Sequence, residues 1–141
     1  FPLTVHESSL SPCVHSILFS SINNIDKAFE MYLRTSRLDL DDYNNEVDEG
    51  LHITSMAGSW LSIVEGFAGV RIKDDGIFIS PIIPKKWISY NFKMYYNNEI
   101  IEFLVTNDQV NVTNNSCNNL NLFVDDNKYI LNEKSKKVID L

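Results

Sequence analysis

The spacing of apolar residues changes from a helical period to a strand period near Gly69, and this change limits the fold more than any other feature of the chain. Before Gly69, apolar residues recur at intervals of three and four, which is the period of an amphipathic helix. After it, short alternating stretches are separated by turn residues, which is the pattern of β-strands. The sequence therefore predicts a helical part over residues 1–68 and a β-rich part over residues 69–141.

Three helices are expected in the first part. Ser11-Pro12 is a start signal, because serine is a preferred cap and proline fits the first helical position. Apolar residues at helical spacing run from there to Ile22 and, after an interruption, from Ile25 to Leu33. The third stretch, Ile53 to Ala68, has one apolar face and one face of small residues. Small residues allow another helix or a ligand to approach closely, so we expect this helix to be buried on both faces. Helices this apolar need a larger helical neighbour, which predicts further sequence upstream.

The second part reads as an antiparallel sandwich or jelly roll. Three hairpins are expected in "VRIKDDGIFIS", with an Asp-Gly turn, in "FKMYYNNEIIEFLV", with Asn97-Asn98 at positive φ, and in "NLFVDDNKYIL". "KVIDL" is expected to form a last strand, and the two prolines of "SPIIPKKW" predict an extended linker. Several short strands at roughly ten-residue spacing are typical of a sandwich.

Charge and composition exclude several classes of protein. The net charge of −7 and the pI of about 4.8 argue against a nucleic-acid partner, which would require a basic surface. No apolar run is long enough for a signal sequence or a membrane span. Cys13 and Cys117 lie far apart, and we expect reduced, buried thiols rather than a disulfide. The glycosylation triplets at Asn111 and Asn114 are of the kind that an Asn-rich chain contains by chance.

Hydroxyl and imidazole groups gather at two expected helix starts. Ser8, Ser9 and Ser11 precede the first helix, and His52 and Thr54 open the third. Helix amino ends expose free N–H groups and a positive dipole, so two such ends would form an anion site if they converged, with phosphate as the natural guest. The alternative is that these residues are only structural. A cap alone explains Ser11, and a single histidine beside a Gly-Leu turn is structural more often than not.

The loop "RLDLDDYNNEVDEG" is rich in carboxylates but gives no recognisable metal or catalytic motif. It lacks the alternation and the central glycine of an EF-hand calcium loop. No pair of its carboxylates is placed to raise one pKa for glycosidase chemistry. We interpret it as a solvated loop with local turns. His6 and His15 have no third partner at metal-ligand spacing, so no metal site is expected, and Cys13 is expected in the core.

Three long motifs, "HESSLSPCVHSI", "YLRTSRLDLDDYNNEVDEGLHITSMAGSW" and "IVEGFAGVRI", resemble the closing part of glycoside hydrolase family 65. The resemblance runs from about Val5 to Tyr95 and is closest to the members that phosphorolyse maltose. It implies an α+β, multidomain fragment. Residues 1–68 would be the last helices of an (α/α)6-barrel catalytic domain, and residues 69–141 a small antiparallel, jelly-roll-like β-sandwich.

The activity implied by this resemblance is inverting phosphorolysis of maltose to β-glucose 1-phosphate and glucose. Inorganic phosphate would be the co-substrate, with no metal and no cofactor. The family's general-acid glutamate has no match here and would lie upstream, so the chain alone is expected to be inactive. By motif, Ser8, Ser9 and His52 would bind phosphate, and a supporting shell would consist of His6, Ser11 and Thr54.

Two alternatives remain at this point. The first is another member of the family, acting on kojibiose, nigerose or trehalose, because the linkage-selecting loops would lie largely upstream. The second is a non-catalytic carbohydrate-binding or structural module, in which exposed aromatic side chains stack on sugars: Trp87, Tyr90, Tyr95 and Tyr96. For the phosphorylase, a disaccharide and phosphate are the expected partners, the expected location is cytoplasmic, and a homodimer of the full-length parent is compatible with the family.

Overall fold

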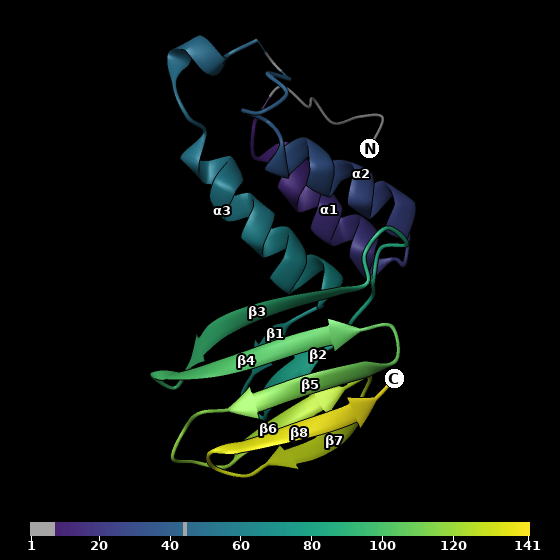
Figure 1. Ribbon diagram of the computed structural model, residues 1–141, viewed down its shortest axis with the longest axis vertical. Helices are drawn as coiled ribbons and strands as arrows, with labels where there is room; N and C mark the ends of the chain where they lie inside the picture. The colour runs from purple at the N-terminus through teal and green to yellow at the C-terminus, as the bar shows by residue number, and fades with distance from the viewer. Residues whose placement is uncertain (1–7, 44) are drawn as a thin grey trace. The chain divides into compact units, whose positions relative to one another are not determined.

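The computed structural model describes residues 8–43 and 45–141. Two compact units divide the chain between Phe67 and Ala68, the first helical and the second built from strands (Figure 1).

The first unit contains the three helices that the sequence predicts. They are α1 (Ser11–Ser21), α2 (Ile25–Ser36) and α3 (Ile53–Leu61). A short 3₁₀ turn, η1 (Val47–Glu49), precedes α3, and a π-helical segment, η2 (Ser62–Phe67), follows it. The expected continuous helix to Ala68 is therefore wrong in its last part, where the winding changes at Ser62.

The start of α1 differs from the prediction by one residue. Leu10 occupies the cap position without a side-chain hydrogen bond, and Ser11 is the first helical residue. Pro12 accordingly lies one position further into the helix than expected. This is tolerated because the amides of the first turn have no intrahelical acceptor, so the missing N–H of proline costs nothing there.

The small face of α3 packs against α1 and α2. At Gly58, a Cβ would lie 3.0 Å from the Cβ of Cys13 and 3.3 Å from the Cγ2 of Thr35, so only glycine fits without displacing a neighbour. The apolar face of α3 is exposed in this chain, with Ile53, Met56 and Trp60 exposed by 64%, 48% and 46%. The expectation of burial on both faces is confirmed for the small face. For the apolar face it is wrong at these three residues but confirmed further along, where Val64, Phe67 and Ala68 are buried.

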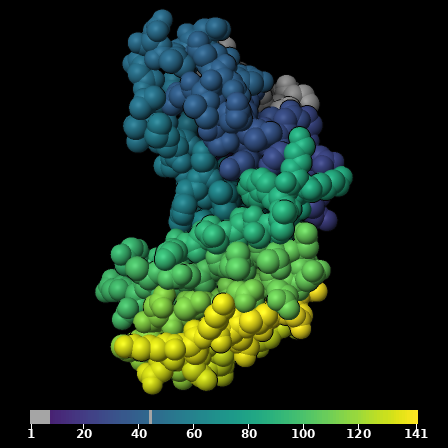
Figure 2. Space-filling model, viewed as in Figure 1, coloured from purple at the N-terminus to yellow at the C-terminus, as the bar shows by residue number. Residues whose placement is uncertain are grey.

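The second unit is a β-sandwich of two four-stranded sheets, which lie in two layers (Figure 1). One sheet has the order β1-β2-β6-β7, formed by Arg71–Lys73, Gly76–Ile79, Leu120–Val124 and Asn127–Leu131. The other has the order β3-β4-β5-β8, formed by Ser89–Tyr96, Glu99–Thr106, Gln109–Asn114 and Ser135–Asp140. Figure 2 shows the surface of this second sheet, from β3 in green to β8 in yellow. Alternate side chains of both sheets are buried, as in a sandwich core.

The hairpin turns follow their local sequences. Asn97 and Asn98 have φ values of 51° and 64°, and Asp125 and Asp126 have 44° and 67°, so both pairs adopt the left-handed conformation that two-residue hairpin turns require. In the first hairpin, Asp74 and Asp75 lie between the strands and Gly76 is the first residue of β2.

Three features of this unit differ from the sequence-based expectation. The pairing of β2 with β6 is parallel, so the sandwich is not purely antiparallel. Strand β5 was not expected, because its asparagines are unfavourable in strands. Cys117 is exposed, whereas Cys13 is buried as expected. In addition, Asn114 is fully buried and its amide donates to the carbonyls of Asn118 and Asn132, which excludes this side chain from glycosylation in the folded unit.

Candidate functional site

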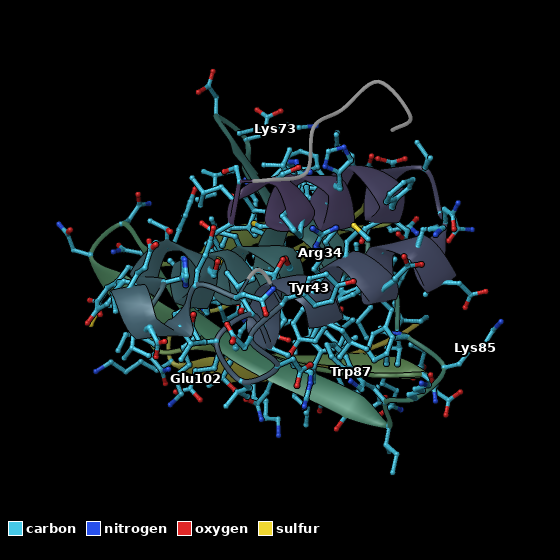
Figure 3. All side chains as sticks on the ribbon, turned by 90° about the horizontal axis from the view of Figure 1, so that it is seen from above. Arg34, Tyr43, Lys73, Lys85, Trp87 and Glu102 are labelled. Carbon is cyan, nitrogen blue, oxygen red and sulfur yellow. The ribbon has the colours of Figure 1, made fainter. Side chains whose placement is uncertain are left out.

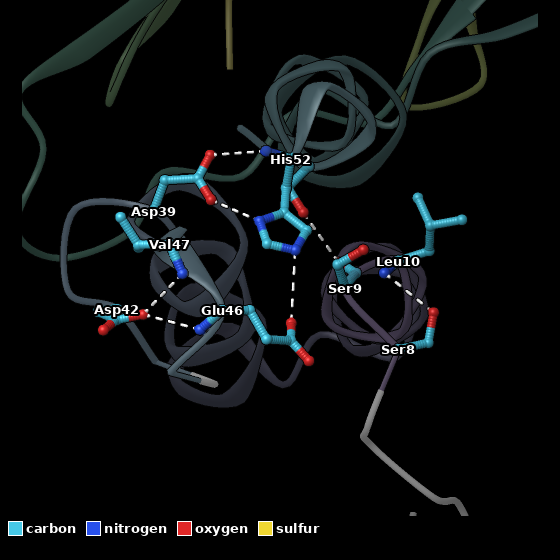
Figure 4. Close-up of polar contacts among 9 residues, drawn as sticks. Ser8, Ser9, Leu10, Asp39, Asp42, Glu46, Val47 and His52 are labelled. Carbon is cyan, nitrogen blue, oxygen red and sulfur yellow. Dashed lines mark hydrogen bonds and ion pairs between the residues drawn. The ribbon is translucent and has the colours of Figure 1, made fainter. Parts of the chain in front are cut away.

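His52 lies at the cap position of α3, between the acidic loop and the helix. Its carbonyl accepts hydrogen bonds from Ser55 N at 2.9 Å and Met56 N at 3.2 Å, so its backbone begins the helix. Its imidazole does not cap the helix and points instead toward the loop (Figure 4). The ring is therefore free of the usual capping role and can be held by other groups.

Asp39 holds His52 at two points. His52 Nδ1 donates to Asp39 Oδ1 at 2.6 Å, and the backbone N of His52 donates to Asp39 Oδ2 at 2.9 Å (Figure 4). The side chains of His52 and Asp39 are only 22% and 15% exposed. Both hydrogen bonds favour ionised Asp39 and lower its pKa, the imidazole bond more than the backbone bond. A carboxylate that binds both backbone and ring fixes where the ring points.

The second ring nitrogen of His52 faces another carboxylate. Glu46 Oε2 lies 3.4 Å from Nε2. A neutral imidazole carries a proton on one nitrogen only, and an ionised carboxylate can only accept, so both contacts are hydrogen bonds only when His52 is protonated. The hydrogen bond to Asp39 and, to a smaller extent, Glu46 raise the pKa of His52 above its ordinary value. The geometry thus favours the imidazolium.

Asp42 shapes the loop that brings Glu46 to His52. Its Oδ1 accepts from the backbone N of Glu46 at 3.0 Å and of Val47 at 3.1 Å (Figure 4). Nearby, the guanidinium of Arg34 lies 4.7 Å from the ring centre of Tyr43, two residues labelled in Figure 3. The acidic loop is therefore organised around His52 in part, and its reading as only a solvated surface loop is wrong for Asp39 and Glu46.

The serine segment before α1 meets the start of α3. Ser55 Oγ donates to the carbonyl of Ser9 at 3.1 Å, which ties the two amino ends together (Figure 4). Ser8 Oγ accepts from Leu10 N at 3.3 Å, and its side chain is exposed. The structure thus brings Ser8, Ser9 and His52 into one region, as two converging helix starts would require.

The expected supporting residues are less clearly engaged. Ser11 Oγ lies 3.4 Å from Nδ1 of His15, within its own helix. Thr54 is exposed on the first turn of α3. His6 lies outside the described residues. A small recess at the site is lined by these residues: Leu38, Asp39, Asp42, Glu46, Val47 and His52.

Within residues 8–43 and 45–141, no three His, Cys, Asp or Glu side chains are grouped so that they could hold a metal ion. No helix in the described part of the chain has both the length and the apolar character needed to cross a membrane.

The aromatic residues of the sandwich give little support to a sugar platform. Tyr90 is 7% exposed, and burial raises its pKa. Trp87 packs edge-on against Tyr90, with ring centres 5.9 Å apart (Trp87 is labelled in Figure 3). Of the four aromatics considered, only Tyr95 is largely exposed, at 73%. A single exposed ring does not make a stacking surface.

The chain matches two models of one protein family. Residues 1–61 match the glycosyl hydrolase family 65 central catalytic domain, and residues 70–131 match the glycosyl hydrolase family 65 C-terminal domain. Together they cover nearly the whole chain.

Several proteins similar to this chain are sugar phosphorylases. Maltose phosphorylase of Bacillus subtilis is 52% identical over 109 residues, which are 77% of this chain and 14% of that protein. Alpha,alpha-trehalose phosphorylase of Geobacillus stearothermophilus is 49% identical, over 67% of this chain and 12% of that protein. Kojibiose phosphorylase of Halothermothrix orenii is 35% identical, over 97% of this chain and 16% of that protein. The chain thus matches about a seventh of the length of these relatives.

A solved structure has the same fold over almost the entire chain. It is that of a "putative kojibiose phosphorylase from human microbiome". The TM-score is 0.89 at 41% sequence identity, and the match covers 98% of this chain and 20% of that one. Both the helical unit and the sandwich therefore have a counterpart in one larger protein.

Proposed function

The chain belongs to glycosyl hydrolase family 65, and on that premise we propose that it is the phosphate-binding portion of an inverting α-glucoside phosphorylase. The reaction proposed for the full-length protein is phosphorolysis of maltose to β-glucose 1-phosphate and glucose. We propose maltose as the substrate, and not trehalose or kojibiose, because the maltose phosphorylase is 52% identical to this chain and the other two relatives are 49% and 35% identical.

The observation that carries the proposal is that the amino ends of α1 and α3, beside which Ser8, Ser9 and His52 lie, are joined by the hydrogen bond from Ser55 Oγ to the Ser9 carbonyl. A protonated imidazole and serine hydroxyls are donors suited to a phosphate dianion, and helix amino ends favour negative charge. In the proposed mechanism, these groups hold phosphate in line with the anomeric carbon of the sugar. Phosphate then attacks from the face opposite the departing glucose, while a glutamic acid outside this chain protonates the glycosidic oxygen.

The barrel is part of the same proposal. α1 and α3 expose apolar side chains that further barrel helices would cover: Val14, Leu18, Ile22, Met56 and Trp60. A soluble single domain rarely leaves so many large apolar side chains exposed on adjacent helices. This supports helices 1–68 as the closing part of an (α/α)6 barrel, and it predicts that the chain by itself is inactive and tends to aggregate.

Phosphorolysis by the full-length protein tests the proposal directly. Maltose, trehalose, kojibiose and nigerose would each be supplied with and without inorganic phosphate, and glucose 1-phosphate and its anomeric form would be measured. We expect phosphate-dependent release of the β-anomer, fastest from maltose. Release of glucose at the same rate without phosphate would refute the phosphorylase function, and a preference for another disaccharide would refute only the choice of maltose.

A further inference from the structure

We propose that Asp39 is a positioning residue that holds His52 as a donor toward phosphate, and that Glu46 is the side chain which phosphate replaces at Nε2. The inference rests on the proposed phosphate site and assigns roles to two carboxylates that the resemblance to the family did not identify.

Asp39 has the geometry of a positioning group. Its two oxygens bind two different parts of His52, the ring Nδ1 at 2.6 Å and the backbone N at 2.9 Å. With Nδ1 held in this way, Nε2 points away from Asp39 and toward the carboxylate of Glu46 (Figure 4). Without Asp39, His52 would be free to carry its single proton on either nitrogen, and the ring could turn.

Glu46 differs from Asp39 in ways that suit a replaceable partner. Its oxygen lies 3.4 Å from Nε2, which is long for a charge-assisted hydrogen bond, and its side chain is 40% exposed against 15% for Asp39. Of the two carboxylates on the ring, Glu46 is therefore the one that an anion from solvent can displace.

Phosphate is a better partner for Nε2 than Glu46. It carries a higher charge at neutral pH and more acceptor oxygens, and a serine hydroxyl such as that of Ser8, just before α1, has a proton that it can donate. As long as Glu46 stays, its charge opposes the arriving anion. Binding is then an exchange of one anion for another at a single N–H. The charged side chains lining the recess are Asp39, Asp42 and Glu46, and of these Asp39 and Glu46 raise the pKa of His52.

Two substitutions with matched controls separate the two roles. Asp39→Asn removes the charge and one acceptor but keeps the shape, and Glu46→Gln does the same at Nε2. Asp48→Asn and Glu49→Gln change charge by the same amount in the same loop on exposed residues, so they control for long-range electrostatics. Both measurements would use the full-length protein with ¹⁵N-labelled histidine, in which ¹H–¹⁵N NMR of the imidazole would follow the protonation and tautomer of His52. Phosphate affinity would be measured by titration with inorganic phosphate at low salt.

The two substitutions should change the affinity for phosphate in opposite directions. Asp39→Asn should lower the pKa of His52 and weaken phosphate binding by at least about tenfold, because a hydrogen bond between charged groups is lost. Glu46→Gln should strengthen phosphate binding by about two- to fivefold, the range for a partly exposed ion pair. The two controls should change the affinity less than Glu46→Gln does.

Each failure has a separate meaning. If Asp39→Asn leaves the His52 titration and tautomer unchanged, the role of Asp39 is refuted whatever phosphate does. If phosphate binds the wild type but Glu46→Gln weakens phosphate binding or leaves it unchanged, the replacement of Glu46 by phosphate is refuted. Because Glu46 is partly exposed, this variant remains informative even if Asp39→Asn fails to fold. Absence of phosphate binding by the wild-type full-length protein would overturn the role of Glu46 and the phosphate site itself, while the Asp39 contact would still be judged by NMR.

Discussion

Gly76→Ala should destabilise the β-sandwich strongly, because glycine is needed there for two separate reasons. Gly76 has φ of +142°, a backbone conformation that residues with a Cβ rarely adopt. A Cβ at this position would lie 2.3 Å from the backbone oxygen of Asn121 and 2.9 Å from its Cβ. The obstacle includes main chain at the start of the parallel β2–β6 pair, which cannot move aside as a flexible side chain could.

The size of the effect follows from these two terms. A residue held in a sparsely populated backbone region costs about 1–3 kcal/mol, and forcing an extra carbon into a packed site costs about 1–3 kcal/mol. Together they give about 4 kcal/mol for Gly76→Ala as a central value. A unit of this size has a total stability on the order of 7 kcal/mol at a typical value per residue. The variant should therefore still fold, with roughly half its stability lost.

Urea denaturation followed by tryptophan fluorescence can measure this change in the correct unit. The chain has two tryptophans, Trp60 in the helical unit and Trp87 in the sandwich, so a Trp60→Phe background reports the sandwich alone. The matched control is Gly50→Ala, read by Trp60 in a Trp87→Phe background. Gly50 has φ of +119° but no atom within 4 Å of its Cβ position, so this substitution should cost only the backbone term. A loss at Gly76 no greater than the loss at Gly50 would refute the argument from close approach.

Two further predictions concern titration and thiol reactivity. The pKa of His52 is raised in the folded state, so the stability contributed by His52 is fully present below its unfolded pKa of 6.5 and is lost as pH rises through its folded pKa. The pKa of Asp39 is lowered in the folded state, so the stability contributed by Asp39 is present above its unfolded pKa of 3.8 and is lost as pH falls through its folded pKa. The pair should thus stabilise the helical unit most between these two values, and Asp39→Asn should flatten the pH profile of the urea midpoint read by Trp60; an unchanged profile would contradict the assignment. Cys117 should react with Ellman's reagent in the folded protein, whereas Cys13, which is buried and has a raised pKa, should react only on unfolding; equal rates would show that Cys13 is accessible.

The features that could be predicted from the sequence are local ones. Asn97-Asn98 takes the left-handed conformation because of its own side chains and neighbours, and the helix periods of α1 to α3 are visible within windows of a dozen residues. The small face of α3 was also readable, because Gly58 and its neighbours recur at helical spacing. Which face of that helix is covered depends on neighbours elsewhere in the fold, and period alone could not show that Trp60 stays exposed.

The features that could not be predicted depend on contacts between distant segments. The parallel pairing of Ile77 with Leu122 joins strands more than forty residues apart, and nothing in either strand specifies its partner's direction. At the site, the motif resemblance indicated Ser8, Ser9 and His52, but not Asp39. Asp39 is one of several carboxylates with similar sequence neighbours, and only the folded loop shows that Asp39 is the one hydrogen-bonded to Nδ1 of His52.

Asp39 has two roles that a single substitution cannot separate by affinity alone. Its contact with the backbone N of His52 anchors the start of α3, where an ordinary cap would use the side chain of the cap residue itself. Its contact with Nδ1 orients the ring, so a loss of phosphate binding in Asp39→Asn could arise from a displaced helix start. The contact of Glu46 with His52 is made to Nε2 of the ring, whereas Asp39 binds both the ring and the backbone N of His52. Opposite changes in phosphate affinity in the two variants, with the same stability of α3 in Glu46→Gln and wild type, would assign the effect to the imidazole. A loss in both would assign it to the loop as a whole.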